Sequence, residues 1–378
     1  MKIGIVTTEV LKTAPKGFYN YQQIGLAKAL DKIVERIDIY KAVSKKGVFQ
    51  VEKLTETKNV YLHLIPALHL GSNGFFSHRY LDKGLTALIV CGDVQLAVPS
   101  LYKFCKRNNI IFISYIGVTE SHSTNALYGN IINRLARRNY LIYNKECCLA
   151  KTPTVRDALI KKGVKNVTIA PVGLDFSVIN KKYKDSSKEE LREHLGFQQE
   201  EKILLYIGRL TKEKRPILML DILKTLVARD KDYRLVMIGE GELNAQVEEK
   251  IIEYNLQENV KRIEKIPNKE IWQYYRISDC FVNLNTQEIF GMCILEAMYY
   301  ECKVVALHAP GPDYIIRDKK DGLLCENKEQ IIDAINYGMV DIESAHKRVL
   351  EKFTWDTTAK SMVSYIDSVE LSTDAISL

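Results

Sequence analysis

Residues 287–298 read QEIFGMCILEAM, and this stretch decides the organisation of the second half of the chain. The apolar run after Gly291 predicts a buried helix that begins at this glycine, so Glu288 belongs to the preceding loop and Glu296 to the helix. The free amides of a helix start favour an anion such as a diphosphate, and a carboxylate further along can accept hydrogen bonds from the hydroxyls of a ribose. The stretch therefore indicates a nucleotide-sugar pocket.

A simpler interpretation of the two carboxylates is also open. Glu288 can cap the helix and Glu296 can be a solvated helix residue, because carboxylates near a helix start are favoured in any protein. The rest of the sequence has to separate the two interpretations.

Length and composition limit the number of domains and the class of protein. The chain has 378 residues and 46% hydrophobic content, which is enough for two domains of ordinary size. No stretch approaches the roughly 18 consecutive apolar residues that span a membrane, and the first residues are too short and too charged for a signal peptide. We therefore expect a cytoplasmic protein. Its eight cysteines contain no C-x-x-C pair, which predicts reduced core residues and no zinc site.

Charge is divided unevenly along the chain. Residues 1–176 carry 25 Lys and Arg against 12 Asp and Glu, whereas residues 177–378 carry 29 against 35. Basic clusters at residues 103–107, 134–138 and 161–165 can attract an acidic acceptor or hold the first half on an anionic membrane. Ordinary solvated helix faces explain these clusters equally well. Nucleic acid is a weaker partner, because no basic stripe interleaved with aromatic residues is present.

Strands alternate with helices along the whole chain, which predicts an α/β protein with parallel sheets flanked by helices. We expect strands at 3–7, 37–43, 87–91, 110–116, 167–171, 203–208, 234–238, 260–266, 280–284 and 303–307. We expect helices from Asn20 to Leu30 and at 94–107, 153–162, 216–229, 243–254 and 268–277. The polar stretch 180–201 is the best linker candidate, so two doubly wound domains follow. Ligands of such sheets bind at the carboxyl ends of the strands.

The loop after the first strand of the second half carries two cations. Residues 208–216 read GRLTKEKRP, with Arg209 at the strand end and Lys214 at the next helix entrance. Both are expected at the same edge of the sheet as the helix start at Gly291. This arrangement can stabilise the negative charge of a departing diphosphate. Ordinary surface charges remain an alternative for the pair taken alone.

The chain resembles the retaining family 4 glycosyltransferases over essentially its whole length. The segments that carry the resemblance are GRL with a lysine at 208–214, GEG at 239–241, EIFGMCILEAM at 288–298, KTPTVRDAL at 151–159, PVGLD at 171–175 and FTWD at 353–356. The resemblance implies the GT-B fold, in which two Rossmann-like doubly wound domains face each other across a cleft. It implies an N-terminal acceptor-side domain of residues 1–178 plus about 356–378, and a C-terminal donor-binding domain of residues 179–355.

Residue roles follow from the same resemblance. Arg209 and Lys214 would neutralise the donor diphosphate as it leaves, Glu288 would hold the donor sugar, and Glu296 the ribose hydroxyls. Arg209, Lys214 and Glu288 are the catalytic candidates. The donor-binding candidates are Gly17, Gly208, Arg209, Lys214, Gly239, Lys265, Ile266, Glu288, Ile289, Phe290, Gly291, Met292, Cys293 and Glu296.

The acceptor side departs from the family pattern. Residues 15–18 read PKGF in place of paired glycines, so Phe18 and Tyr19 are candidates for lining the acceptor mouth. The family commonly has a histidine after a middle strand of the first domain, where this chain has Tyr115, Ile116 and Gly117. His122 follows closely and can substitute for it, or it can be a loop histidine with no role.

The implied activity is that of a retaining hexosyl- or N-acetylhexosaminyl-transferase in cell-surface polysaccharide biosynthesis. It would move a sugar from a nucleotide-diphosphate donor, with a UDP-sugar favoured, to a glycan or lipid-linked acceptor. No metal or cofactor is expected, because Arg, Lys and helix amides carry the charge of a divalent ion. The expected location is the cytoplasm, with peripheral contact at the inner face of an anionic membrane through the basic first domain.

Three alternatives compete with this function. A catalytically weak GT-B partner or chaperone subunit would keep the fold while its acceptor side drifted. Residues 230–232 read DKD, the D-x-D spacing of metal-dependent sugar transferases, but they stand in a Lys-rich connection that favours a solvated turn. A nicotinamide-dependent dehydrogenase is excluded, because no G-x-G-x-x-G follows the first strand.

Overall fold

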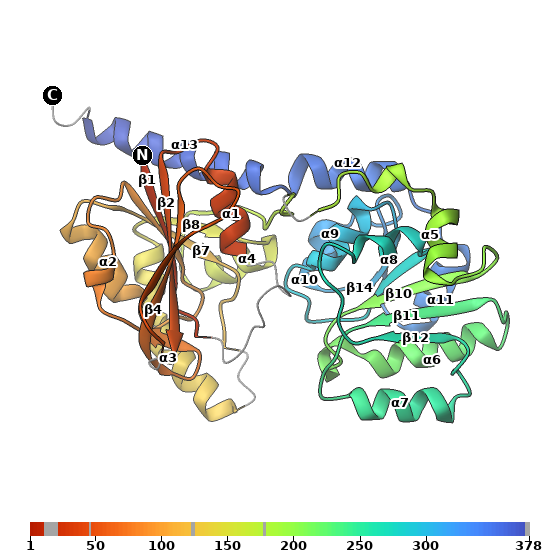
Figure 1. Cartoon of the computed structure of the whole chain (residues 1–378). Helices are drawn as coiled ribbons and strands as arrows, with labels where there is room; N and C mark the ends of the chain where they lie inside the picture. Colours follow the sequence, from red (N-terminus) through yellow and green to blue (C-terminus); the bar gives the residue numbers. More distant parts are fainter. Residues whose placement is uncertain (11–21, 45–46, 122–124, 177–178, 375–378) are drawn as a thin grey trace. The chain divides into compact units, whose positions relative to one another are not determined.

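The computed structural model describes residues 1–10, 22–44, 47–121, 125–176 and 179–374 (Figure 1). Contacts divide the chain into two compact units. The first unit contains the chain up to Gly173 and the segment from Thr354 onward, and the second runs from Leu174 to Phe353.

The first unit is built on one nine-stranded sheet in the order β3-β4-β2-β1-β6-β7-β8-β9, with β5 paired to β4. Its strands are β1 (Lys2–Thr7), β2 (Arg36–Ser44), β3 (Gln50–Lys53), β4 (Val60–Leu70), β5 (Asn73–Phe75), β6 (Ala87–Cys91), β7 (Ile111–Ile116), β8 (Cys147–Ala150) and β9 (Val167–Ile169). Among the described strands of this sheet, β3 and β5 are the two that pair antiparallel, each with β4. The order reverses between β1 and β6, so this unit has a switch point at their carboxyl ends.

Helices cover both faces of this sheet (Figure 1). They are α1 (Gln22–Leu30), η1 (His78–Tyr80), α2 (Val98–Arg107), α3 (Ala126–Tyr143), α4 (Pro153–Lys161) and α13 (Trp355–Asp374). Helix α13 packs on α1 so closely that a Cβ atom at Gly25 would lie 2.2 Å from Trp355 Nε1. Any larger residue at this position would separate the two helices, which gives the glycine a packing role.

The second unit has a six-stranded parallel sheet in the order β12-β11-β10-β13-β14-β15. Its strands are β10 (Lys202–Ile207), β11 (Tyr233–Ile238), β12 (Val260–Ile263), β13 (Cys280–Asn283), β14 (Lys303–Leu307) and β15 (Leu323–Cys325). Numbered along the chain, this is the 3-2-1-4-5-6 order of a doubly wound sheet, with its switch point between β10 and β13. The core is formed by buried aliphatic side chains such as Leu204, Leu223 and Leu235.

Helices also lie on both sides of the second sheet, with α6 and α7 on one side and α8 and α9 on the other (Figure 1). The helices of this unit are η2 (Tyr183–Asp185), α5 (Lys188–Leu195), η3 (Lys212–Lys214), α6 (Pro216–Val227), α7 (Asn244–Glu253), α8 (Trp272–Ile277), α9 (Met292–Tyr299), α10 (Pro310–Ile315), α11 (Lys328–Tyr337) and α12 (Ile342–Lys352). The two-sheet α/β architecture is the expected fold class.

The unit boundaries differ by a few residues from the expected division. The chain enters the second unit at Leu174 and leaves it at Phe353, and the Leu174 amide donates to the Phe353 carbonyl at 2.8 Å. The stretch 180–201, expected as a linker, is part of the second unit. Tyr183 is buried there against the rings of Tyr299 and Tyr300.

Several predicted elements are shorter in the structure, and the largest differences are at β12, α8 and α2. Strand β12 ends at Ile263 instead of residue 266, and α8 begins at Trp272 because residues 264–271 form a loop and turn around Pro267. Helix α2 begins at Val98 because the preceding residues form a turn in which the Gln95 amide donates to the Gly92 carbonyl at 2.7 Å. The long helix α3 and the strand β4 were not predicted.

Candidate functional site

A small hollow opens at the switch point of the second unit. Its lining comes from the ends of the two strands that flank this point and from the loop after β10. The lining residues are Tyr206, Ile207, Lys214, Val282, Asn283, Leu284 and Asn285. Ligands of doubly wound sheets bind outside the carboxyl ends of the strands at the switch point. The hollow is therefore the candidate ligand site of the second unit.

Lys214 and Glu288 meet beside the hollow. The Lys214 ammonium donates to Glu288 Oε2 at 2.5 Å, and the Asn285 side-chain amide donates to the same oxygen at 3.1 Å. Both charged side chains are partly buried, and Asn285 is buried. The loop after β10 thus meets the loop before α9, as the sequence predicted for two residues of one rim.

Asn285 was missed in the sequence, although it orders the loop before α9. Its own amide donates to Asn283 Oδ1 at 3.1 Å, and its Oδ1 accepts from the Gln287 amide at 2.9 Å. The two asparagines at the carboxyl end of the apolar strand β13, Asn283 and Asn285, were the available signal. Arg215 was also missed, and its guanidinium donates to the Thr286 hydroxyl at 3.2 Å.

Arg209 is exposed and lies apart from the Lys214 pair. Within the part of the chain that the structure describes, its nearest acidic group is Glu213, at 3.5 Å. It follows Gly208 directly at the end of β10. Its long side chain can move because most of it is exposed to solvent. As predicted, the backbone of both Arg209 and Lys214 lies at the same edge of the sheet as Glu288. Of these two side chains, only that of Lys214 contacts Glu288.

Gly239 brings the next loops onto the same edge of the sheet. Its φ of +137° lies in a region that glycine adopts and other residues rarely do. A Cβ atom at this position would lie 1.9 Å from the Gly208 carbonyl oxygen. The Gly239 amide donates to the Ile263 carbonyl at 2.8 Å, which ties the ends of β10, β11 and β12 together. Beyond β12, Lys265 pairs with Glu240 at 2.7 Å and Ile266 is partly buried.

Helix α9 begins directly after Gly291, as predicted. Gly291 has a φ of +100°, and the Gly311 amide donates to the Glu288 carbonyl at 2.7 Å, which fixes the entry of the chain into the helix. Phe290 is buried, and Ile289, Met292 and Cys293 are partly buried around the helix start. The first amides of a helix have no acceptor within it and carry its positive dipole end, so they can receive an anion.

Glu296 faces the protein rather than solvent. It is partly buried, and the Tyr275 hydroxyl donates to Glu296 Oε2 at 2.8 Å. Burial raises the pKa of Glu296 to about 7, against the opposing effect of the Tyr275 hydrogen bond. The interpretation of Glu296 as a solvated helix residue is therefore wrong, because its carboxylate is withdrawn from water. Tyr275, 21 positions away, was missed.

The remaining candidates divide between surface loops and undescribed residues. Gly17, Phe18, Tyr19 and His122 lie outside the described residues. The 230–232 segment is a turn in which Asp230 accepts from the Asp232 amide at 3.0 Å and pairs with Lys202 at 2.6 Å. This agrees with the solvated turn that the sequence favoured over a metal site.

The carboxyl edge of the first sheet carries charged groups that the sequence analysis did not select. Lys151, after β8, donates to Gln22 Oε1 at 2.9 Å and lies 5.0 Å from the ring centroid of Tyr115. Asp93, after β6, accepts from the Gly117 amide at 2.6 Å. Burial and the neighbouring Asp93 raise the pKa of Glu9, after β1, while Lys151 lowers it. Lys151, Asp93 and Glu9 each lie within two positions of the end of a parallel strand, which was the missed signal.

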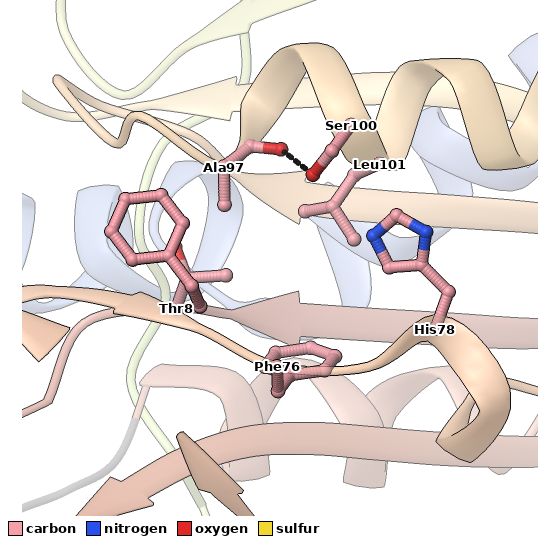
Figure 2. Close-up of a pocket in the computed structure, with 7 residues that line it drawn as sticks. Thr8, Phe76, His78, Ala97, Ser100 and Leu101 are labelled. Carbon is pink, nitrogen blue, oxygen red and sulfur yellow. Dashed lines mark hydrogen bonds between the residues drawn. The ribbon is translucent and has the colours of Figure 1, made fainter. Parts of the chain in front are cut away.

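A second hollow lies at the switch point of the first unit. Figure 2 shows Thr8, Phe76 and His78 on one side of it and Ala97, Ser100 and Leu101 of the α2 region on the other, and Phe75 completes the lining. The lining is mainly apolar, and burial lowers the pKa of His78.

Comparison with known proteins relates the second unit to one family. Residues 187–349 match the model of glycosyl transferases group 1, a span that contains Lys214, Glu288 and Glu296. This part of the chain is similar to the group 1 glycosyl transferases. The resemblance recognised in the sequence is thereby confirmed, and the site residues of the second unit stand inside the domain that defines the family.

Curated relatives match about half of the chain. The chain is 25% identical over 210 residues to the alpha-monoglucosyldiacylglycerol synthase of Acholeplasma laidlawii, a match that covers 54% of this chain and 52% of that protein. It is 24% identical over 222 residues to the Streptococcus pneumoniae protein of the same name, covering 58% and 50%. The chain thus spans about half the length of the curated relatives it matches.

Solved structures match nearly the whole chain. The sucrose-phosphate synthase of Thermosynechococcus elongatus has a TM-score of 0.74 at 15% identity, covering 98% of this chain and 99% of that one. HepE of Anabaena in complex with UDP has a TM-score of 0.71 at 14% identity, covering 97% and 100%. The chain has the GT-B fold, as predicted. Among its described residues, no helix combines the length and the apolar character that a membrane crossing requires.

Proposed function

We propose that this chain is a retaining glycosyltransferase that takes its sugar from a nucleotide-diphosphate donor bound at the switch point of the second unit. The observation that carries the proposal is the contact of Lys214 with Glu288 beside the start of α9. These groups lie at one sheet edge and match the parts of such a donor. The cation can contact the diphosphate, the carboxylate can accept hydrogen bonds from the sugar hydroxyls, and the helix start can bind the phosphate oxygens.

The donor assignment follows the geometry of the second unit. The α9 amides and Lys214 hold the diphosphate, Glu296 accepts hydrogen bonds from the ribose, and the backbone at Lys265 and Ile266 contacts the base. A UDP-sugar is favoured, and structures of HepE are described as complexes with UDP and with UDP-glucose. The transferred group would be a hexosyl or N-acetylhexosaminyl residue.

Charge neutralisation is the main catalytic contribution in this proposal. As the sugar–diphosphate bond breaks, negative charge builds on the β-phosphate, and Lys214, Arg209 and the α9 amides stabilise it. These groups carry the charge that a divalent ion would otherwise balance, so the reaction would proceed without metal or cofactor. Glu288, held by Lys214 and Asn285, orients the sugar for attack on the face from which the diphosphate leaves.

The acceptor is proposed to be a glycan or lipid-linked molecule bound by the first unit, within cell-surface polysaccharide synthesis. Lys151, Asp93 and Glu9 at the carboxyl edge of the first sheet offer polar groups for its hydroxyls. The basic first half would keep the protein in the cytoplasm at the inner face of an anionic membrane. Two curated relatives named as glucosyldiacylglycerol synthases support a lipid acceptor.

A donor screen with a mass-spectrometric readout tests this function. The chain is incubated with a panel of UDP-, GDP- and ADP-sugars, with and without lipid extracts, and products of hydrolysis and transfer are measured. We expect turnover of one UDP-sugar, near-complete loss in Glu288→Gln, and no change in Glu249→Gln, which alters an exposed carboxylate of α7. Full activity of Glu288→Gln, or no turnover of any donor, would contradict the proposal.

A further inference from the structure

Helix α3 of the first unit is apolar on its outer side as well as its inner side. Its inner side packs Ile132, Ala136 and Tyr143 into the core. On the outer side, Leu127, Ile131 and Leu135 follow one another at intervals of four residues and are 78%, 58% and 43% exposed. Residues four apart lie on one face of a helix, so these three leucine and isoleucine side chains form a continuous exposed stripe.

The outer side of α3 is also basic. The helix sequence ALYGNIINRLARRNYLIY contains three arginines and no acidic residue. Arg134 is exposed between Ile131 and Leu135, and Arg137 and Arg138 are exposed one turn further on. Acidic residues beyond the two ends of the helix are engaged by lysines, Glu120 with Lys162 at 2.8 Å and Glu146 with Lys106 at 3.5 Å.

The end of β4 extends this apolar stripe. Leu68 and Leu70 are 59% and 52% exposed. The Tyr128 hydroxyl on α3 donates to the Leu70 carbonyl at 2.9 Å, so the strand end and the helix start form one surface. We call the group of Leu68, Leu70, Leu127, Ile131, Arg134 and Leu135 the α3 surface.

We propose that the α3 surface docks the protein on a lipid bilayer that contains anionic lipids. Exposed leucines interleaved with arginines are the composition of a helix that lies in the membrane interface, where the leucines enter the acyl boundary and the arginines contact lipid phosphates. A second copy of this chain docked through the same surface would bring arginines against arginines, so charge complementarity disfavours a symmetric dimer here. The inference deepens the proposed function by naming the surface that reaches a lipid-linked acceptor.

Vesicle co-sedimentation tests this surface directly. The full chain is mixed with vesicles of phosphatidylcholine alone or with phosphatidylglycerol added, at low and high salt. We expect binding to the anionic vesicles that weakens at high salt, because surface charges are screened. Binding by Arg134→Gln/Arg137→Gln should fall about 10-fold or more. The variant Leu127→Ser/Ile131→Ser/Leu135→Ser should lose binding even at low salt.

Matched controls separate this inference from the donor site and from misfolding. Ile252→Ser changes an equally exposed apolar residue on α7 of the second unit, and it should bind vesicles as the wild type does. UDP titration of each variant shows whether the protein is folded and its donor site intact. Wild-type failure to bind anionic vesicles at low salt, or wild-type-like binding by the leucine variant, would overturn the inference and point to a protein partner. Equal binding to neutral vesicles would overturn the role of the arginines.

Discussion

The ammonium of Lys214 lies 2.5 Å from the carboxylate of Glu288, whose other donor is the side-chain amide of Asn285. The cation proposed for the diphosphate is therefore paired with the carboxylate proposed for the sugar. A diphosphate has to share Lys214 with Glu288 or draw it away. The pair links nucleotide binding to the orientation of the group that holds the sugar, and the first prediction tests that link.

Glu288→Gln should separate nucleotide binding from transfer. The neutral amide releases Lys214 to the diphosphate, so UDP affinity should rise a few-fold, while kcat should fall by about 100-fold or more because the sugar loses its charged partner. Calorimetry and kinetics of the purified variant measure the two effects. Parallel losses of both, with Glu249→Gln unaffected, would argue that Glu288 acts only by supporting the loop.

Lys214 and Arg209 should contribute unequally. Lys214 is partly buried and contacts Glu288, whereas Arg209 is exposed and has room to move. We expect Lys214→Met to weaken kcat/KM by about 100-fold or more, and Arg209→Met to act mainly on kcat with a smaller change in KM. Lys231→Met, in an exposed turn of the same unit, is the control. The reverse order of effects would show that Arg209 is the principal phosphate contact.

Glu296 should make donor binding depend on pH. Its pKa is raised to about 7, so the folded protein holds a proton that the unfolded chain releases near pH 4.3. Stability of the empty protein should therefore decline as pH rises from about 4.3 to about 7, and change little from this group above that. Ribose hydroxyls favour the carboxylate, which lowers its pKa on binding.

Proton release upon UDP binding measures this effect. Calorimetry at about pH 6.5 in two buffers of different ionisation enthalpy should report a larger proton release for the wild type than for Glu296→Gln. Subtracting the proton release measured for Glu296→Gln removes the contribution that comes from the titration of UDP itself. The same proton release from both proteins would remove Glu296 from the ribose site.

Asp321 should control the acid stability of the second unit. Burial alone would raise the pKa of Asp321, but hydrogen bonds from Arg317 and Ser344 outweigh it and hold the pKa below its usual range. Its contribution to stability is therefore full above about pH 4 and is lost as pH falls further. Asp321→Asn should cost roughly 3 kcal/mol at pH 7 in denaturant unfolding, because Arg348 stays largely buried beside it. A loss that persists unchanged at pH 3 would contradict this origin.

Local pattern predicted the second unit well. The start of α9 at Gly291 and the shared rim of Lys214 and Glu288 follow from a glycine, an apolar run and the rule that ligands meet strand ends. The contacts of Tyr275 with Glu296 and of Arg215 with Thr286 did not follow, since they depend on how separate loops pack. Helix α3 was not predicted, because exposed apolar residues such as Leu127 and Ile131 weaken the contrast between its two sides.

The most direct test of the central claim is a calorimetric titration of the full chain with UDP, beside ADP and GDP. The account predicts one UDP per chain, with Kd between about 1 μM and 1 mM. It predicts that Lys214→Met weakens binding by about 10-fold or more and that Lys231→Met leaves it unchanged. No binding of any nucleoside diphosphate at millimolar concentration, or equal affinity of wild type and Lys214→Met, would contradict a donor site at the switch point of the second unit.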